Sequence, residues 1–405
     1  MGIFCWQEGT MKNDTKIIKS TIRFQNKVTQ VFTGEFWTSG QRQGNNLHEI
    51  AYRACFKPAL PEYFIQRYSK KGDIVYDPFS GRGTTIIEAA LSGRNIIAND
   101  INPISSILSK GRLIIPNLLL LEKRLNIIQN EPVEKEEHQL LMFYHKDTFH
   151  EILQLRQWLK KRKKEKKEDA LDRWIRMVAT NRLTGHSPGF FSVYTLPPNQ
   201  AVTRERQKKI NVSRKQKPEY RSTKDLILKK SRSLIKDINV AQLHNLNSAS
   251  NNAVFINKDA GDTKSIKNNT VQLTITSPPF LDVVQYSKDN WLRCWFNDLD
   301  AKTIEQNITM SKTIDEWIVV MQKVFNELYR ITKPGGILAF EVGEVRKGKI
   351  KLEEYVLPMG LKAGFNCKHI IINAQNFTKT ANIWGVHNNV KGTNSNRIVV
   401  FEKKG

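Results

Sequence analysis

The sequence predicts an α/β protein with a mostly parallel sheet, divided by a basic, mainly helical insertion. Residues 74–76 and 95–98 are short apolar runs, separated by a glycine-containing loop and a helical pattern at 84–91. Such a strand–helix–strand unit builds parallel sheets. The alternation of strands and helices returns from residue 253, and a region rich in Lys and Arg lies between the two parts.

The composition points to a polyanionic partner. The chain has 405 residues and 64 Lys and Arg against 39 Asp and Glu, giving a formal net charge of +25. This balance favours nucleic acid as the partner, ahead of an acidic membrane surface. No apolar run approaches the roughly 18 residues of a membrane span, and the N-terminus lacks the apolar segment of a signal peptide, so we expect a cytoplasmic protein with no membrane partner.

The cysteines indicate neither a metal site nor a disulfide framework. They are far apart and form no Cys-x-x-Cys pair: Cys5, Cys55, Cys294 and Cys367. Metal-binding and disulfide-rich proteins space their cysteines more regularly. None of the four follows a proline, so the Pro-Cys nucleophile that attacks carbon 5 of cytosine is absent.

The first part of the predicted catalytic domain spans residues 35–111. Before it, residues 1–34 are polar and mixed, and we expect a poorly packed arm. Pro61 suits the first position of a helix. The strand at 74–76, the helix at 84–91 and the strand at 95–98 follow, and Asn99-Asp100 ends the last of these.

Residues 112–250 form the predicted insertion, which we interpret as a DNA target-recognition region. It contains helical patterns at 118–128 and, as one long basic stretch, at 151–179. Residues 204–237 hold 13 Lys and Arg against four Asp and Glu. A solvated helix face is the alternative interpretation of each charge run, more so for residues 160–168 than for 204–237.

Residues 251–405 form the second part of the catalytic domain. Strands are predicted at 254–256, 271–275 and 337–342, and helices at 317–332 and 355–363. Two final strands, at 368–373 and 396–402, are predicted to pair as a hairpin with a long loop.

The loop after the first strand has the features of a cofactor site. Gly81 and Gly83 let the backbone pass close to a ligand at the carboxyl end of a parallel strand, where open α/β sheets bind cofactors. Asp100 is placed to accept both hydroxyls of a ribose, although acids after strands also cap turns. Asp259 is expected near an adenine edge, with Asp262 as a competitor for that role.

The strand at 271–275 ends in Thr276-Ser277-Pro278-Pro279-Phe280. Consecutive prolines remove backbone donors and fix φ, which stops the strand and holds the chain rigid. Free carbonyls beside an aromatic ring suit a planar ring with an amino group, as in a nucleobase pulled out of its stack. An ordinary Pro-Pro turn is the alternative.

At these residues the chain resembles the amino-methylating DNA methyltransferases that use S-adenosylmethionine. Residues 77–85 (DPFSGRGTT) are similar to that family's cofactor motif, and residues 276–280 (TSPPF) to its catalytic motif. The family mostly has Ser-Pro-Pro-aromatic in cytosine-N4 enzymes and Asp-Pro-Pro-Tyr in adenine-N6 enzymes. Phe280 departs from the usual tyrosine but keeps a stacking face. Residues 38–58 resemble, in degenerate form, the segment that closes over the cofactor's methionine part. The resemblance covers about residues 35–112 and 250–405.

The resemblance implies a Rossmann-like class I fold, with a mostly parallel seven-stranded sheet ending in an antiparallel hairpin. The implied catalytic residues are Ser277, Pro278, Pro279 and Phe280. The implied cofactor-binding residues are Asp77, Pro78, Phe79, Ser80, Gly81, Gly83, Thr84, Thr85, Asp100, Ile101, Asp259 and Thr276, with His48 from the degenerate segment. No metal is implied.

The implied reaction is a direct methyl transfer to the N4 amino group of a flipped cytosine in duplex DNA. The base stacks on Phe280, and its amino group donates to the Ser277 hydroxyl and the Pro278 carbonyl. DNA contacts are expected from cations and one histidine of the insertion: Arg182, His186, Arg204, Arg206, Lys208, Lys209, Arg214 and Lys215.

Three other functions stay open at this stage. They are an adenine-N6 DNA methyltransferase, an RNA amino-methyltransferase and a non-catalytic nucleic-acid-binding protein. The DNA enzyme is expected to serve a restriction–modification system, with the restriction endonuclease as a separate protein.

Overall fold

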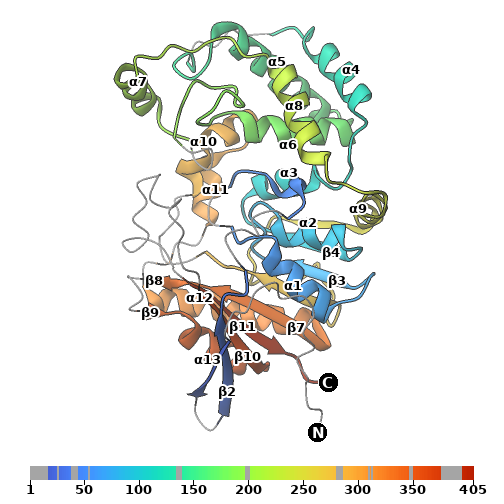
Figure 1. Ribbon diagram of the computed structural model, residues 1–405, viewed down its shortest axis with the longest axis vertical. Coiled ribbons are helices and arrows are strands. Elements are labelled where there is room, and N and C mark those ends of the chain that lie inside the picture. Colours follow the sequence, from blue (N-terminus) through green and yellow to red (C-terminus); the bar gives the residue numbers. More distant parts are fainter. Residues whose placement is uncertain are drawn as a thin grey trace.

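A computed structural model describes residues 17–24, 27–37, 44–52, 55–133, 139–196, 201–279, 286–308, 311, 313–345, 350–374 and 395–405. In Figure 1 the β-sheet lies in the lower half of the molecule and a helical part lies above it. No helix among these residues is long and apolar enough to cross a membrane.

The main sheet has nine strands within the described residues. Its spatial order is β1 (Ile18–Phe24), β2 (Lys27–Gly34), β10 (Asn366–Ala374), β11 (Ser395–Glu402), β7 (Thr332–Val342), β6 (Val271–Thr276), β3 (Ile74–Asp77), β4 (Asn95–Asn99) and β5 (Val254–Ile256). The strands from β7 to β5 are mutually parallel, and β11 runs antiparallel between β7 and β10. The short strands β8 (Glu344–Val345) and β9 (Ile350–Lys351) pair separately.

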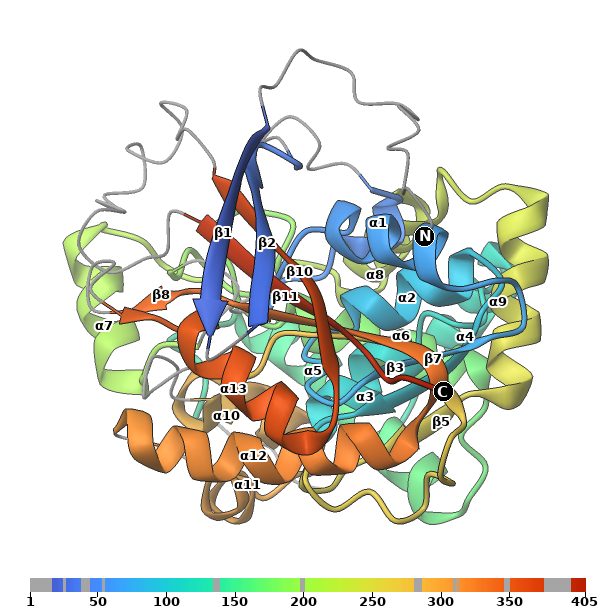
Figure 2. The same cartoon turned by 90° about the horizontal axis from the view of Figure 1, so that it is seen from below.

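Helices cover both faces of this sheet (Figure 2). The helices α1 (Ala59–Tyr68), α2 (Thr84–Leu91), α3 (Pro103–Lys110) and α9 (Val240–Asn252) pack on one face, and α12 (Ile314–Ile331) and α13 (Glu353–Ala363) pack on the other. Neighbouring residues of one strand point to opposite faces. Accordingly, Val75 packs with the apolar residues under α1 and α2, and Tyr76 packs with those under α12 and α13.

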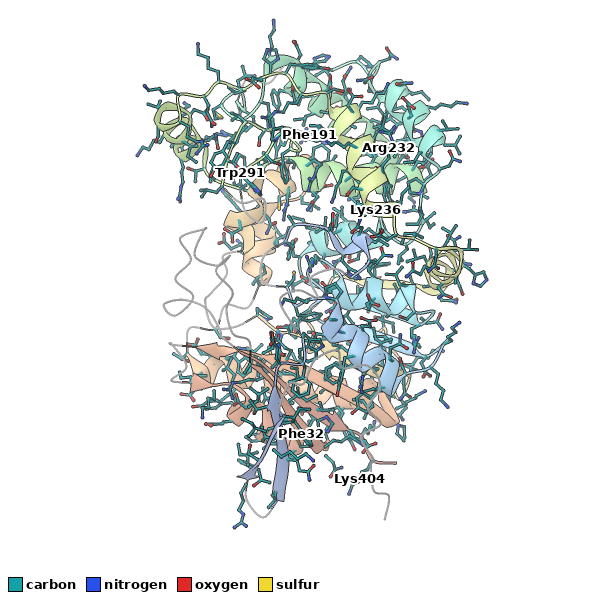
Figure 3. All side chains as sticks on the ribbon, viewed as in Figure 1. Phe32, Phe191, Arg232, Lys236, Trp291 and Lys404 are labelled. Carbon is teal, nitrogen blue, oxygen red and sulfur yellow. The ribbon has the colours of Figure 1, made fainter. Side chains whose placement is uncertain are left out.

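The helical part contains α4 (Leu118–Ile128), α5 (Lys146–Lys164), α6 (Ala170–Arg182), α7 (Arg204–Ser213) and α8 (Thr223–Ile235). Helices α10 (Tyr286–Phe296) and α11 (Ala301–Asn307), from the second half of the chain, lie against it. Figure 3 labels Phe191 inside this part and Trp291 on α10. Apolar residues of α2, α4, α5, α6 and α8 belong to one continuous cluster, so the helical part shares its core with one face of the sheet.

The predicted fold class is confirmed: the sheet is mostly parallel and ends in the antiparallel pair β10–β11. The strand count was too low, because β1 and β2 lie within the residues that we expected to form an arm. Strand β2 pairs parallel with β10 and buries Val31 and Phe32, a long-range pairing that no local pattern signals.

The prediction of a single long helix at 151–179 is wrong, because two helices, α5 and α6, occupy this stretch. Lys166 between them has a left-handed backbone with φ of 58°. Asp169 then caps α6 through a capping box with Asp172. These short-range signals override the continuous helical pattern.

Candidate active site

A pocket with about 830 Å³ of empty space, open to solvent, lies at the carboxyl ends of the parallel strands. The loops after β3, β4, β5 and β6 supply most of its walls. Strand order reverses between β3 and β6, and ligands bind at this switch point in open α/β sheets.

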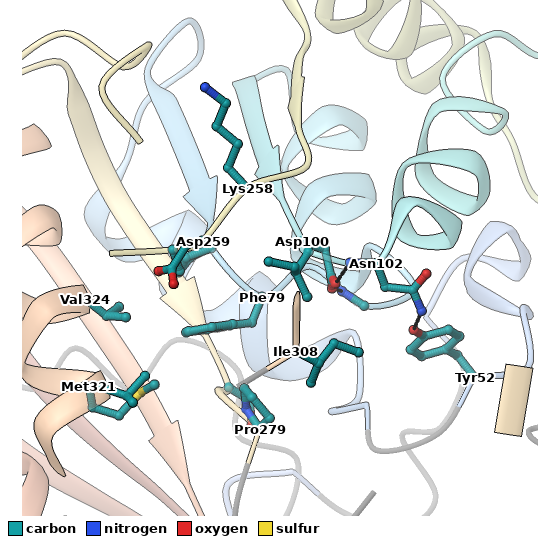
Figure 4. A pocket seen from close by; sticks show the side chains of 16 residues that line it. Tyr52, Phe79, Asp100, Asn102, Lys258, Asp259, Pro279, Ile308, Met321 and Val324 are labelled. Carbon is teal, nitrogen blue, oxygen red and sulfur yellow. Dashed lines mark hydrogen bonds between the residues drawn. The ribbon is translucent and has the colours of Figure 1, made fainter. Parts of the chain in front are cut away.

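Figure 4 shows the side chains that line the pocket. Its polar lining comes from Asp100, Asn102, Lys258, Asp259 and Ser277. Its apolar lining comes from Pro78, Phe79, Ile101, Ala260, Pro279, Ile308, Val320, Met321 and Val324, and Tyr52 and Gly81 complete it. A lining with both polar and apolar side chains suits a ligand that is part sugar and part flat ring.

Asp100 is held in place by backbone groups. Its Oδ2 accepts the Gly81 N–H at 2.8 Å and its Oδ1 accepts the Asn102 N–H at 2.9 Å. Gly81 has a positive φ of 51°, which favours glycine. Burial raises the pKa of Asp100 to about 6, and these two hydrogen bonds oppose the rise. The carboxylate is thus oriented toward the pocket before any ligand arrives.

The loops around the pocket are bonded to one another. The Asn99 amide donates to the carbonyls of Pro78 (3.2 Å) and Lys258 (3.0 Å), and it accepts the Lys258 N–H at 3.1 Å. The Ser80 hydroxyl donates to the Asn99 carbonyl at 2.7 Å. A single asparagine at the end of β4 therefore joins the loops after β3 and β5.

Asp77 lies beneath these loops and is buried. Its Oδ1 accepts the Thr276 hydroxyl at 2.6 Å and the Phe79 N–H at 3.1 Å. Burial raises the pKa of Asp77 to about 7, against the effect of these hydrogen bonds. The Asp77–Thr276 bond joins the ends of β3 and β6, which precede the two sequence motifs.

The Ser-Pro-Pro segment is fixed from two sides. Burial raises the pKa of Glu341 on β7, while hydrogen bonds from Asn396 and from the Ser277 hydroxyl favour its charged form. The Asn396 amide lies 2.7 Å from Glu341. On the other side, the indole of Trp317 donates to the Pro279 carbonyl at 3.1 Å. Neither Glu341 nor Trp317 was singled out from the sequence.

The segment 44–52 carries a further wall residue, Tyr52. The Asn102 amide donates to its hydroxyl at 3.4 Å. A Cβ placed on Gly81 would lie 3.6 Å from the tyrosine ring, an ordinary van der Waals distance, so the two residues are neighbours in the pocket wall. Sequence reasoning did not identify Tyr52, although it lies in the segment that we compared with the cofactor-closing part of the family.

The structure brings eight of the predicted site residues to the pocket wall: Pro78, Phe79, Gly81, Asp100, Ile101, Asp259, Ser277 and Pro279. Asp259 lies in the wall, whereas its competitor Asp262 does not. Seven others are buried or half-buried outside the lining: Asp77, Ser80, Gly83, Thr84, Thr85, Thr276 and Pro278. Phe280 lies outside the described residues.

His48, which the resemblance places at the cofactor, contacts a glutamate of α2. Its Nε2 lies 2.9 Å from Glu88 of α2, both side chains are largely buried, and His48 is not in the pocket lining. Burial lowers the pKa of this histidine. The contact ties the segment 44–52 to the helix that follows the glycine loop.

The predicted DNA-contacting residues divide into two groups. Six cations are exposed on α7 or just after it: Arg204, Arg206, Lys208, Lys209, Arg214 and Lys215. His186 is exposed on a loop, whereas Arg182 is half-buried, binds Asn181 at 2.8 Å and stacks on the Phe190 ring. Burial lowers the pKa of Arg182 to about 10, and the nearby Arg293 adds to this.

The two basic runs of the helical part differ in their partners. On α5, Lys160 pairs with Asp298, Lys161 with Glu131, and Arg162 with Asp169 and Asp172. Around α7, no ion pair involves these six cations within the described part of the chain. Arg214 and Arg204 face the rings of Tyr194 and Trp291 instead.

Comparison with known proteins supports the resemblance drawn from the motifs. A family described as DNA methylase matches residues 6–107, which include β1, β2 and the glycine loop. The type II methyltransferase M.MjaII of Methanocaldococcus jannaschii is 37% identical over 76 residues, covering 18% of this chain and 14% of the relative. The orphan methyltransferase M.BamHII of Bacillus amyloliquefaciens is 39% identical over 85 residues, covering 20% and 31%.

A longer alignment reaches beyond the N-terminal part. The type II methyltransferase M.BsoBI of Geobacillus stearothermophilus is 23% identical over 303 residues, 69% of this chain and 58% of the relative. The matches thus span less than two thirds of each of these three relatives.

Among solved structures, a TehB-like SAM-dependent methyltransferase of Corynebacterium glutamicum aligns over 85% of this chain and 87% of its own, with a TM-score of 0.32 and 8% identity. A likeness this weak supports no conclusion about function. The matches confirm that the chain resembles the amino-methylating DNA methyltransferases.

Proposed function

We propose that this protein is an S-adenosylmethionine-dependent DNA methyltransferase that modifies the exocyclic N4 amino group of cytosine. One observation carries the proposal. Asp100 and the Ser277–Pro279 segment, which are 177 positions apart in the sequence, line the same pocket at the switch point of the sheet. Residues suited to a nucleoside and residues suited to an amino group thereby share one site.

The side chains that line the pocket suit the chemical groups of S-adenosylmethionine. Both Asp100 oxygens already accept one backbone N–H each, and the remaining lone pairs can accept ribose hydroxyls. Phe79 and Met321 offer apolar surface for a flat base, and Asp259 lies near them (Figure 4). When bound, the cofactor would supply an electrophilic methyl group.

Ser277 is the proposed acceptor for the target amino group. A hydroxyl that donates to Glu341 turns its oxygen lone pairs toward other donors, and an exocyclic amino group is such a donor. Methylation of the amino nitrogen requires the loss of one of its protons. Glu341, whose raised pKa favours proton uptake, can accept that proton through the Ser277 hydroxyl.

The choice of cytosine N4 over adenine N6 rests on Ser277. The family mostly has serine at this position in cytosine enzymes and aspartate in adenine enzymes, so adenine N6 is the alternative. A flipped base is proposed to stack on Phe280, because chemistry on the amino group requires the base outside the duplex.

Helix α7 is the proposed DNA-contacting surface. Its exposed cations have no ion-pair partner among the described residues, whereas Lys160, Lys161 and Arg162 of α5 pair with carboxylates of the fold. Unpaired Lys and Arg bind phosphates and release counterions, which makes DNA binding salt-dependent. We further propose a role as the modification enzyme of a restriction–modification system, in line with the type II names of the relatives.

Digestion of DNA treated with the protein and S-adenosylmethionine, followed by nucleoside mass spectrometry, tests the proposal. N4-methylcytosine is expected. N6-methyladenine would move the enzyme to the adenine class, and modification of RNA in preference to duplex DNA would favour the RNA amino-methyltransferase. No methylated nucleoside, together with no cofactor binding in calorimetry, would return the protein to the class of non-catalytic nucleic-acid binders.

A further inference from the structure

Tyr52 forms a pocket wall that is held by residues outside the catalytic motifs. Its side chain is 9% exposed and lies between Asn102 and Gly81. Asn102 also donates its backbone N–H to Asp100. The tyrosine is therefore in direct contact with the loop that orients the proposed ribose acceptor.

Ala51, the residue before Tyr52, is hydrogen-bonded through both its backbone N–H and its carbonyl. The Asn181 Oδ1 accepts the Ala51 N–H at 3.3 Å, and the Asn181 Nδ2 donates to the Ala51 carbonyl at 2.9 Å. Arg293 donates to the same carbonyl at 3.0 Å. Its guanidinium carbon also lies 5.8 Å from the centre of the Tyr52 ring.

These two side chains come from separate elements. Asn181 lies in the last turn of α6, inside the predicted insertion, and it is 2% exposed. Arg293 lies on α10, the first described helix after the Ser-Pro-Pro segment. The hydrogen bonds to Ala51 thus connect the pocket wall to the helical part and to the helix that follows the proposed catalytic segment.

The rest of segment 44–52 is bonded between the same two parts of the molecule. On the insertion side, Asn46 donates to the Ser233 carbonyl at 3.1 Å and Glu49 pairs with Lys230 at 3.0 Å. On the side of the glycine loop, the guanidinium group of Arg82 donates to the carbonyl of Ile50 (3.2 Å), and that of Arg112, at the boundary of the two parts, donates to the carbonyl of Leu47 (3.0 Å). The segment has contacts on both sides and only one short 3-10 turn of its own.

From these contacts we infer that Asn181 is a positioning residue for the cofactor pocket, acting through Ala51 on Tyr52. The inserted helical part then has a second role beyond DNA contact, because it completes a wall of the cofactor site. This inference rests on the proposed function, since it takes S-adenosylmethionine as the ligand. By linkage, a DNA-induced shift of α6 would change cofactor affinity, and cofactor binding would change DNA affinity by the same factor.

A double-mutant cycle on the full chain tests this inference. S-adenosylmethionine binding is measured by calorimetry for the wild type, Asn181→Ala, Tyr52→Ala and the double variant. Asn245→Ala is the matched control. Asn245 of α9 also bonds a backbone carbonyl of the catalytic part, that of Leu91 at 2.8 Å, but it is not in the pocket lining. Thermal unfolding of each variant records the cost to stability separately.

Asn181→Ala is expected to weaken cofactor binding about threefold to tenfold, the range expected for the removal of one or two hydrogen bonds. Asn245→Ala is expected to destabilise the fold to a similar extent and leave cofactor affinity unchanged. In the double variant the loss of affinity should equal that of Tyr52→Ala alone, because coupled residues are not additive. If Asn181→Ala does not fold, Asn181→Ser takes its place in the cycle.

Two results would overturn the inference while leaving the proposed function intact. One is wild-type cofactor affinity in Asn181→Ala, and the other is a double variant whose losses of affinity simply add. Absence of S-adenosylmethionine binding by the wild type would overturn the proposed function, and the inference with it.

Discussion

The pocket edge of the sheet and helix α7 use polar residues in opposite ways. At the pocket edge, Asp77, Asn99 and Asp100 are bonded to backbone groups of neighbouring loops, and their side chains are buried or half-buried. On α7, the cations are exposed and only Gln207 is buried. Polar groups that the fold itself satisfies fix a geometry, whereas groups left exposed and unpaired are available to a partner.

The attachment of α7 follows from this difference. Gln207 and Gln216 each donate to the Tyr194 carbonyl, at 3.1 and 2.9 Å, and Asn211 donates to the Met142 carbonyl at 2.8 Å. The helix is therefore held by amides that carry no charge. Its cations can be removed without breaking the hydrogen bonds that hold it, which makes the comparison testable by mutation.

The largest expected effect comes from the pocket edge. Ser277→Ala should lower turnover about a hundredfold or more, because a positioned proton-transfer partner contributes on the order of 10²–10⁴ in rate. Cofactor affinity should stay near that of the wild type. Single-turnover kinetics with saturating cofactor measures the change, and full activity in this variant would remove Ser277 from the mechanism.

Loss of the oriented carboxylate should be the next largest effect. Asp100→Ala is expected to weaken S-adenosylmethionine binding about tenfold to a hundredfold, since hydrogen bonds to a charged group contribute about 1.5–3 kcal/mol each. Asp262→Ala, which removes the same charge outside the pocket, serves as the control. Because the pKa of Asp100 is raised to about 6, wild-type affinity should also fall as the pH drops below that value. Equal affinity of both variants would contradict the ribose role.

Charge removal on α7 should act on DNA binding alone. Replacing Arg206, Lys208, Lys209 and Lys215 with alanine should weaken duplex binding about tenfold at physiological salt. The slope of log affinity against log salt should fall by about 0.9 for each phosphate that the variant no longer neutralises. Lys160→Ala with Lys161→Ala, which removes two α5 cations that are paired with Asp298 and Glu131, should leave both quantities nearly unchanged. Equal losses of DNA affinity from the α7 and α5 variants would contradict the proposal that α7 rather than α5 contacts DNA.

The smallest expected effect concerns stability without ligand. Asp77 has a folded pKa of about 7, above its ordinary value of 3.8, so the folded protein holds this proton more tightly than the unfolded chain. Stability from this group is present at low pH and disappears as the pH rises between about 4 and 7. Asp77→Asn keeps an acceptor for Thr276 and removes the buried charge, so it should add about 1–2 kcal/mol at pH 8. Thermal unfolding at pH 5 and pH 8 measures this, and a gain at pH 5 as large as that at pH 8 would argue against the ionisation of Asp77 as its source.

Local signals allowed much of the catalytic part to be predicted. The strand, glycine loop, helix and second strand from β3 to β4 lie within some 25 residues, and their apolar runs and glycines mark them directly. Asp100 could be predicted because it follows β4 immediately. The pair β10–β11 was predicted from two apolar runs, and the register between them confirms that pairing.

Residues that act through distant partners could not be predicted. Asn181 bonds Ala51 across 130 positions, and nothing in the sequence around either residue marks the contact. Glu341 lies within a strand and its meeting with Ser277 depends on the order of strands in the sheet. The break between α5 and α6 was hidden because a charged, helix-favouring stretch continues through it. The stacking role of Phe280 stays a prediction.

The N-terminal hairpin has a consequence for how the chain folds. Strand β2 needs β10 as its sheet neighbour, and the backbone N–H of Phe36 bonds the Asn373 side chain across 337 positions. During synthesis the hairpin leaves the ribosome long before its neighbour exists. Contacts of such large sequence separation slow folding, because the chain must give up loop entropy before the contacts form. Docking of the hairpin is therefore expected among the last steps of folding, and until then β2 offers an unpaired edge on which chaperones can act.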